Sequence, residues 1–401
     1  MQFKKLFLLF IVSIVVLGLL GFAIWYRWNT DQKLAQQRIP TITPIAEFNH
    51  GEPWIRDVAI SPVNPNLIAS VGKRNVVKVW NRNSPDAPML TLTDHPGREN
   101  GWASISIDYI AFSPTGEWLA SKDFWNLVFW DVSSSKQINT FESAAGAAAV
   151  SPDGHLLATA SRDVRLWDVR NLEDIKAIVI LPAKMGRQPL SHEEVWSGRH
   201  DVETANQSYR VIDFSSDGKW IAAAGSMYDV EKKIFRGMVK VWDLQHRQLV
   251  KIFPRALPKG VEFQTNTEYN DIRSISFSPD NRFFASIGSY GYTIWTLPEW
   301  HIYCNVHAQY NSKGFVSGGD KNTHTGGYTQ FFSDLAFSPD GKMYAVADGS
   351  VTLWSIESTT PIALLLGNPF VMTFSQDGNT LVGGGIDGVV RLWDVGGLHE
   401  K

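Results

Sequence analysis

The sequence predicts an all-β fold, a seven-bladed β-propeller, preceded by one N-terminal transmembrane helix. Three observations support this prediction: a Ser-Pro-Asp-Gly turn motif that recurs in intact and degenerate forms, a strand ending in tryptophan after each copy, and an apolar run of 21 residues near the N-terminus. A repeat of about forty residues cannot bury its own apolar face, so the seven copies must share a core. The repeats extend from about residue 55 to 395, and we expect them to form one domain.

The N-terminal segment differs from the rest of the chain. Residues 6–26 read LFLLFIVSIVVLGLLGFAIWY, in which Ser13 is the only clearly polar non-aromatic side chain. As a helix, this segment would be about 31 Å long, which matches the hydrocarbon core of a bilayer. We therefore expect residues 1–28 to form a short tail and an uncleaved signal-anchor helix, residues 29–40 a tether, and residues 41–401 the propeller. A cleaved signal peptide is the alternative, although the run is long and no A-x-A-like site follows it.

The charges beside this segment predict its orientation. Lys4 and Lys5 precede the apolar run and hold the short tail on the cytoplasmic side. Arg27, Lys33 and Arg38 follow it and favour the opposite orientation. Because the tail is short and the domain behind it is large, we expect a single-pass protein of the cell membrane with its propeller on the non-cytoplasmic side. A cytoplasmic propeller is the alternative.

The composition limits the classes of partner and the redox chemistry. Lysine and arginine number 37 and the acidic residues 40, giving a net charge of −3. Phosphate binding needs a basic footprint, so this balance argues against nucleic acid as a partner. Cys304 is the only cysteine, which excludes an intramolecular disulfide, and we expect it to be a small buried hydrophobe.

Each repeat divides into four short strands. The Ser-Pro-Asp-Gly turn joins strand a, such as RVIDF, to strand b, such as KWIAAAG; strand c is a run such as VKVWDL and strand d a run such as RQLVKIF. Proline presets the turn and glycine permits its positive φ. Four antiparallel strands in each of seven units describe a propeller. The tryptophans that close strand c are predicted to anchor the blades structurally: Trp80, Trp130, Trp167, Trp242, Trp295, Trp354 and Trp393.

From about residue 42 to 395 the units resemble WD40 repeats, and the chain as a whole is similar to bacterial-type, membrane-anchored WD repeat proteins. Four of the strands end in Trp-Asp, at positions 130, 167, 242 and 393. The family's Gly-His dipeptide is absent as such, and only His50 and His95 lie near its position. Asp163 and Asp387 occupy its b–c turn, so the family's His-Ser-Asp-Trp hydrogen-bond tetrad is expected in few blades. Propellers with the PD40 repeat are an alternative relative, and the tryptophan of strand c favours WD40.

The two ends of the propeller are predicted to meet. After Trp393 only DVGGLHEK remains, which is too short and glycine-rich for a good strand d. Residues 41–48 read TITPIAEF, a strand with no blade of its own. It resembles the overlap closure of WD40 propellers, in which the N-terminal strand completes the last blade. Closure removes sheet edges that would otherwise pair with other chains.

Unequal spacing of the tryptophans locates the extra chain. The intervals are 50, 37, 75, 53, 59 and 39 residues. The excess falls in four d–a connectors, at about residues 94–105, 182–207, 254–270 and 307–331, and in one b–c connector at about 225–237. Antiparallel strands alternate in direction, so b–c and d–a connectors emerge from the same face of the disc. Loops on a rigid scaffold commonly carry binding, so this face is the predicted interaction surface.

Aromatic and arginine side chains of these insertions are the candidate partner-binding residues, because such residues are enriched at interface anchors. The alternative is that they only pack the insertions onto the ring. The candidates are Trp196, Arg199, His200, Met227, Tyr228, Phe235, Arg236, Tyr310 and Phe315.

No catalytic motif is found: the sequence lacks G-x-S-x-G, H-E-x-x-H, P-loop and C-x-x-C patterns. We therefore predict a non-enzymatic protein-interaction scaffold, without a cofactor, that binds an unidentified protein or peptide and the lipid bilayer. An enzyme or a small-ligand receptor at the channel mouth is the alternative. Its candidate metal ligands match no known spacing and are His192, His200, His307 and His324.

Overall fold

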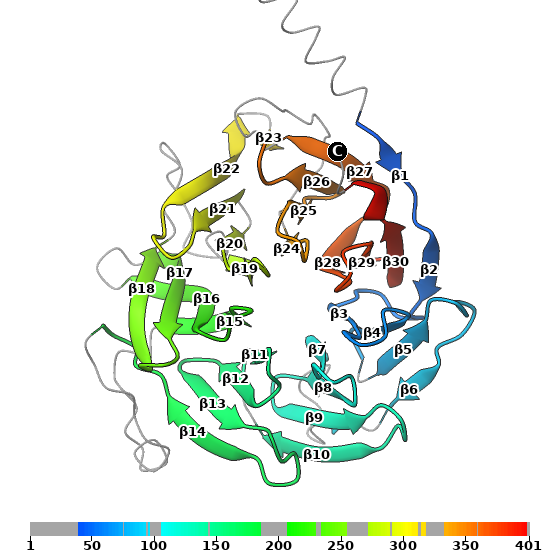
Figure 1. The fold of residues 1–401 in the computed structure, drawn as a ribbon, viewed down its shortest axis with the longest axis horizontal. Coiled ribbons are helices and arrows are strands. Elements are labelled where there is room, and N and C mark those ends of the chain that lie inside the picture. Colours follow the sequence, from blue (N-terminus) through cyan, green and yellow to red (C-terminus); the bar gives the residue numbers. More distant parts are fainter. Residues whose placement is uncertain are drawn as a thin grey trace, which may run out of the picture.

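The computed structural model arranges the chain as seven β-sheets around a central axis (Figure 1). Residues 39–398 are described, except 75, 94, 97–105, 143–144, 186–206, 230–233, 255–271, 289–290, 312–313, 318–332 and 359. The prediction of an all-β, seven-bladed propeller is confirmed. Among the described residues, no helix is long and apolar enough to cross a bilayer. The apolar run at residues 6–26 lies outside the described part of the chain, and so do the proposed tail and most of the tether.

The strands of each blade are antiparallel neighbours in sequence order. Blade 1 is β3 (Asp57–Ile60), β4 (Leu67–Val71), β5 (Val77–Asn81) and β6 (Leu90–Leu92); blade 2 is β7 (Tyr109–Phe112), β8 (Trp118–Lys122), β9 (Asn126–Asp131) and β10 (Gln137–Glu142). Blade 3 is β11 (Ala147–Val150), β12 (Leu156–Ala160), β13 (Val164–Asp168) and β14 (Lys176–Ile180); blade 4 is β15 (Gln207–Phe214), β16 (Trp220–Asp229), β17 (Ile234–Asp243) and β18 (Gln248–Pro254).

The last three blades include the additions to the basic pattern. Blade 5 is β19 (Ile272–Phe277), β20 (Phe283–Gly288), β21 (Gly291–Thr296) and β22 (Ile302–Asn311), with a fifth strand β23 (Gly314–Ser317). Blade 6 is β24 (Asp334–Phe337), β25 (Met343–Ala347), β26 (Val351–Ser355) and β27 (Pro361–Leu365). Blade 7 is β28 (Pro369–Phe374), β29 (Thr380–Gly385) and β30 (Val389–Asp394), followed by a short 3-10 helix, η2 (Gly396–Leu398).

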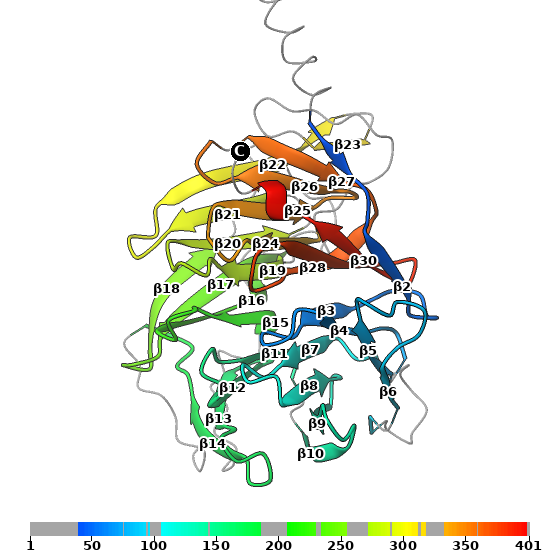
Figure 2. The ribbon, with the colours of Figure 1, turned by 45° about the vertical axis from the view of Figure 1, so that its right-hand side comes forward.

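The N-terminal residues close the ring with two strands. β2 (Ala46–Asn49) pairs antiparallel with β30 and completes blade 7, with Phe48 opposite Val390. β1 (Thr41–Ile42) pairs in parallel with the end of β27 in blade 6. The segment predicted as one closing strand is therefore two strands that bridge neighbouring blades, along the outside of the ring (Figure 2).

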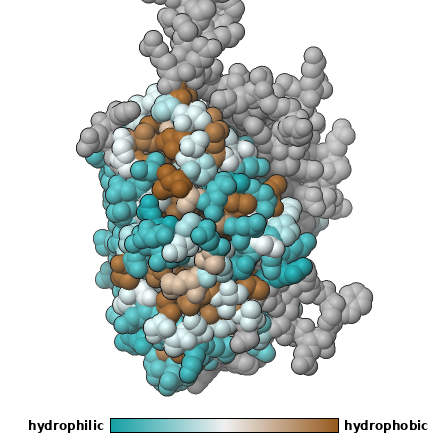
Figure 3. All heavy atoms as spheres, turned by 90° about the vertical axis from the view of Figure 1, so that its right-hand side faces the viewer, coloured by the Kyte–Doolittle hydropathy of each residue, from teal (hydrophilic) through white to brown (hydrophobic). Residues whose placement is uncertain are grey.

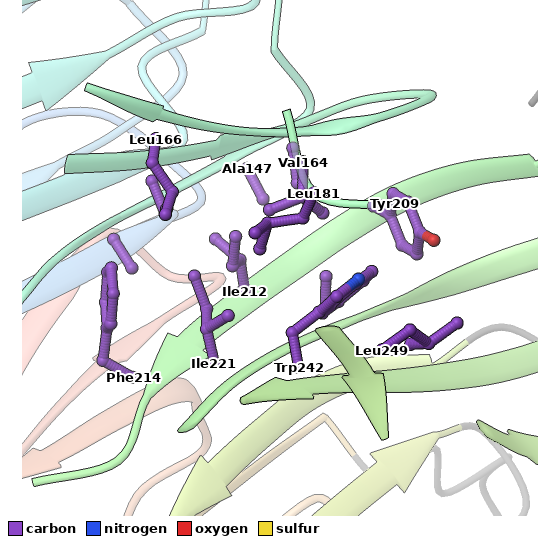
Figure 4. Close-up of a cluster of buried hydrophobic side chains, with 14 of the residues drawn as sticks. Ala147, Val164, Leu166, Leu181, Tyr209, Ile212, Phe214, Ile221, Trp242 and Leu249 are labelled. Carbon is purple, nitrogen blue, oxygen red and sulfur yellow. The ribbon is translucent and has the colours of Figure 1, made fainter. Parts of the chain in front are cut away.

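The core lies between neighbouring blades. Blades 3 and 4, for example, bury Val164, Leu166, Tyr209, Ile221 and Trp242 against one another (Figure 4). Each blade alone is a twisted sheet with two apolar faces, so burial requires a blade on either side. This packing explains why the repeats form one body.

All seven tryptophans of the repeat lie on the third strand of their blades. Trp242 and Trp393 are almost fully buried, whereas Trp167 and Trp354 are half-buried. The indole of Trp80 donates to Ser70 Oγ at 2.8 Å, and that of Trp130 donates to Ser121 Oγ at 2.8 Å. These bonds connect strand c to strand b, so the tryptophans serve the blades structurally.

The Ser-Pro-Asp-Gly turns form one repeated hydrogen-bond network. In five blades a buried serine donates to the aspartate two residues later, with Oγ to Oδ1 distances of 2.5 to 2.7 Å. The same oxygen accepts the N–H of the residue that opens strand b, at 2.8 to 2.9 Å. These carboxylates fix turns, as their repetition predicts. The serines are Ser151, Ser215, Ser278, Ser338 and Ser375.

Candidate interaction face

The alternating strands give the disc two different faces. The a–b and c–d turns lie on one face, which we call the tight-turn face, and the b–c and d–a connectors lie on the other, the connector face. The predicted insertions belong to the connector face. The site is therefore built from the connectors of the described blades.

Two β-hairpins extend past the other strands of the connector face. In blade 4, β16 and β17 pair over ten residues, with Met227 opposite Arg236 and Tyr228 opposite Phe235. In blade 5, β22 continues beyond β21 and pairs with β23, with Tyr310 opposite Phe315. These two hairpins, on adjacent blades, arrange six of the predicted partner-binding residues as three cross-strand pairs.

The two predicted residues of the first hairpin whose side chains are described, Met227 and Tyr228, are both half-buried. Met227 packs against the core between blades 3 and 4, so it supports the ring. The side chains of Phe235, Arg236 and the blade 5 pair lie outside the described part of the structure.

The other predicted residues have no described position. Trp196, Arg199 and His200 lie in the segment 186–206, which is outside the described residues. The candidate metal ligands His192 and His324 are outside them as well, and His307 is placed only as a backbone position on β22. Among the described residues, no group of three or more histidine, cysteine or acidic side chains could hold a metal.

Phe124, in the b–c turn of blade 2, and Trp54 are exposed aromatic residues of the described connector face that the sequence did not single out. Trp54 is the one with a left-handed backbone. It lies in the connector from β2 to β3, and its side chain is 44% exposed. Its φ is +68°, a conformation that is strained for a bulky residue. The Trp54 N–H donates to Ile386 O at 3.1 Å, which holds the strained residue against the b–c turn of blade 7. The backbone thus fixes this indole in an exposed position.

Phe370 and Ile386 of blade 7 lie next to Trp54. The rings of Trp54 and Phe370 have centroids 6.5 Å apart. Ile386 is 43% exposed, and Leu366, in the connector that leads to β28, is 46% exposed. The close approach of the two loops requires glycine at 388, because a Cβ there would lie 2.0 Å from Glu52 O. We call Trp54, Leu366, Phe370 and Ile386 the apolar rim.

Basic side chains border the apolar rim on blade 1. The guanidinium of Arg56 lies 5.6 Å from the centre of the Trp54 ring, in cation–π geometry. Lys73 and Arg74 are exposed in the b–c turn of blade 1. Glu52 Oε2 accepts the Arg74 N–H at 3.0 Å, which fixes this turn beside the Trp54 loop. The rim therefore combines exposed apolar surface with three cations.

Carboxylates on the innermost strands join the blades around the ring axis. Asp57 Oδ2 accepts the Ile110 N–H of the next blade at 2.8 Å, and Asp213 does the same for Phe277 at 2.9 Å. Asp334 makes the equivalent bond across blades 6 and 7. Burial raises the pKa of Asp57 to about 8 and that of Asp213 to about 7. Because each carboxylate is bonded between strands, these groups join blades together.

Blade 2 contains only part of the hydrogen-bond tetrad expected from the resemblance: the Trp130 indole donates to Ser121 Oγ, but neither ring nitrogen of His95 has a hydrogen-bond partner among the described residues. His95 Nδ1 lies 3.6 Å from Asp123 Oδ2, and both side chains are buried. Asp123 is a b–c turn aspartate that the sequence comparison overlooked, because its turn, KDFWN, lacks the usual pattern. His50 is also buried, and burial lowers its pKa to about 4, so its ring is neutral at pH 7. These polar residues of the connector face are structural.

Two parts of the chain match a known family. Residues 321–355 and 365–394, which include strands of blades 6 and 7, match the family model "WD domain, G-beta repeat". An alignment that covers 40% of this chain is 28% identical over 187 positions to Telomerase protein component 1 of Rattus norvegicus. The match covers 7% of that protein, so the chain spans a small part of this relative's length. Together, the matched blades and the seven-bladed ring support a WD40-repeat protein.

Proposed function

We propose that this protein is a membrane-anchored interaction platform that holds a protein or peptide partner on its connector face. The observation that carries the proposal is the pair of β-hairpins, β16–β17 and β22–β23, which extend from neighbouring blades beyond the same face. Hairpins that extend past a rigid ring offer backbone and side chains for contact.

The kind of propeller supports the same role. WD40 propellers typically bind proteins and act without catalysis, and the chain resembles them in its repeats and its fold. On the tight-turn face, by contrast, serine and aspartate side chains are bonded within their own turns. These serine and aspartate side chains are therefore occupied within the turns.

The anchor is the second part of the proposal. Residues 6–26 have the length and composition of a transmembrane helix, and lysines precede them. We propose that this segment is an uncleaved signal anchor of the cell membrane and that the propeller lies on the non-cytoplasmic side. A reporter fused to the C-terminus tests the side: activity of a reporter that works only outside the cytoplasm supports the proposal, and activity of a cytoplasmic reporter contradicts it.

The partner face is tested by shortening the blade 4 hairpin. Residues 227–236 are replaced by a two-residue turn, and the full-length chain is purified from detergent-solubilised membranes with its bound proteins. We expect specific partners to be lost from this variant and retained by Val63→Ala, a change at an exposed residue of the tight-turn face. Equal thermal unfolding temperatures establish that the ring is intact. An unchanged set of partners would show that the partner binds elsewhere.

A further inference from the structure

We propose that the apolar rim and its neighbouring cations contact the headgroup region of an anionic lipid bilayer, so that the ring rests on the membrane. This inference depends on the membrane anchor of the proposed function. It goes beyond that function because it assigns a second, lipid-binding surface to the propeller itself.

The rim consists of apolar side chains, most of which are exposed to solvent. Trp54, Leu366 and Ile386 are each more than 40% exposed, and they belong to blade 7 and the connectors on either side of it. The side of the ring that carries β1 and β2 shows hydrophobic residues in separate groups on a hydrophilic surface (Figure 3). Tryptophan and aliphatic residues beside lysine and arginine are typical of the membrane–water interface.

The rim also lies next to β1, the strand that follows the predicted tether and anchor. The Leu366 N–H donates to Ile42 O at 2.9 Å, and the Leu364 N–H donates to Pro40 O at 2.9 Å. Exposed Leu366 is therefore in direct backbone contact with β1. The predicted tether, residues 29–40, reaches at most about 40 Å when fully extended. A short tether gives the rim a high effective concentration at the bilayer surface.

Positive charge borders the rim, because Arg56, Lys73 and Arg74 are exposed there. Basic residues next to an apolar surface bind anionic lipid headgroups, and this attraction adds to the insertion of apolar side chains. Two carboxylates also belong to this surface: Glu52 accepts the Arg74 N–H, and Asp387 is paired with Arg391.

The strained backbone of Trp54 also favours contact with a bilayer. A left-handed conformation at a tryptophan costs free energy, and exposure of the indole to water gains none. A bilayer compensates for both, because it removes the indole from water while leaving its N–H at the polar interface. The blade 4 hairpin lies across the ring from blades 7 and 1, whereas blade 5 is separated from blade 7 by blade 6 (Figure 1).

The test measures which residues touch lipid. A nitroxide spin label is attached in the full-length chain at Ile386→Cys or, as the matched control, at Val63→Cys, both in a Cys304→Ser background that removes the native thiol. Val63 is 61% exposed on the tight-turn face. The chains are reconstituted into vesicles that contain phosphatidylglycerol, and collisions of each label with oxygen and with a water-soluble nickel chelate are compared.

We expect the label at 386 to meet oxygen more often and the nickel chelate less often than the label at 63. Trp54→Gly, or vesicles of phosphatidylcholine alone, should remove most of this difference. Equal, water-like accessibility of both labels in a chain that resists carbonate extraction would overturn the lipid-binding surface and leave the anchor standing. Release of the chain by carbonate would instead overturn the anchor, and the inference with it.

Discussion

Trp54 and Trp300 share an unusual backbone conformation but lie on opposite faces of the ring. Their φ angles are +68° and +62°. Trp300, in the c–d turn of blade 5, contacts Trp220, Phe253 and Phe284, with ring centroids 5.4 to 6.1 Å away. Trp54 has one aromatic neighbour and an arginine, and it is 44% exposed.

The two tryptophans differ in how far packing inside the molecule compensates for their backbone strain. On the tight-turn face, the strain at Trp300 is offset within the molecule by aromatic packing. On the connector face, the strain at Trp54 is not offset in this way, and the indole remains available for contact. A strained residue without internal compensation indicates a functional surface.

The largest expected effect is on the tight-turn face, at Trp300→Gly. Glycine removes the left-handed strain, but loss of the indole removes contacts with three aromatic rings. We expect the free energy of unfolding to fall by about 2–4 kcal/mol. Urea unfolding followed by circular dichroism measures the change. A variant as stable as the wild type would mean that Trp300 is as dispensable to the ring as Trp54.

A smaller loss is expected from Ser338→Ala, which tests the tight-turn network. Ser338 is fully buried; it donates to Asp340, and it accepts the Met343 N–H. Its removal leaves that buried N–H without this acceptor, at a cost of about 1–3 kcal/mol. Exposed Ser358→Ala is the control and should change the stability by less than about 0.5 kcal/mol. The same urea titration would contradict the structural role if the two variants behaved alike.

The carboxylates between the two faces predict a dependence of stability on pH. Burial raises the pKa of Asp213 from 3.8 to about 7, so the folded chain binds this proton more tightly than the unfolded chain does. The resulting stability is present below about pH 4 and is lost as the pH rises through about 7. Asp213→Asn keeps an acceptor for the Phe277 N–H and should flatten this fall between about pH 4 and 7. Exposed Asp174→Asn should keep the wild-type slope, and equal slopes for all three chains would refute the assignment.

The smallest change in stability is expected from Trp54→Gly on the connector face. Relief of the left-handed strain offsets the few contacts of the exposed ring, so the free energy of unfolding should stay within about 1 kcal/mol of the wild type. The difference in oxygen and nickel-chelate accessibility between labels at positions 386 and 63 should nevertheless shrink. If Trp54→Gly destabilises the chain as much as Trp300→Gly does, the exposed tryptophan belongs to the fold and the contrast between the faces fails.

The repeated features were predictable because each repeat carries its own local signal. The Ser-Pro-Asp-Gly turns and the tryptophan of strand c are short-range patterns, and they identify the seven blades. The strand that closes the ring was predictable because the last blade lacks a fourth strand of its own. The separate strand β1 was not predictable, because its two residues are too few to show a strand pattern in the sequence. The partner-binding residues of the insertions and the membrane segment remain predictions.

The apolar rim could not be predicted because its members are distant in the sequence. Phe370 and Ile386, which lie next to Trp54, follow it by more than 300 residues. The bonds from Asp57 to Ile110 and from Asp334 to Met372 also join different blades. In the sequence these aspartates resemble other acidic residues at strand ends. Only closure of the ring brings such residues together.

The pairing of β2 with β30 also sets an order of events during synthesis. Ala46 pairs with Leu392, so the first blade-forming strand must wait for almost the whole chain to be translated. At ordinary ribosomal speeds this delay is on the order of tens of seconds. During it, the first strand and the growing blades have open edges that can pair wrongly or bind a chaperone. The strand β2 is thus synthesised early but pairs late, so its edge is exposed for most of the synthesis of the chain.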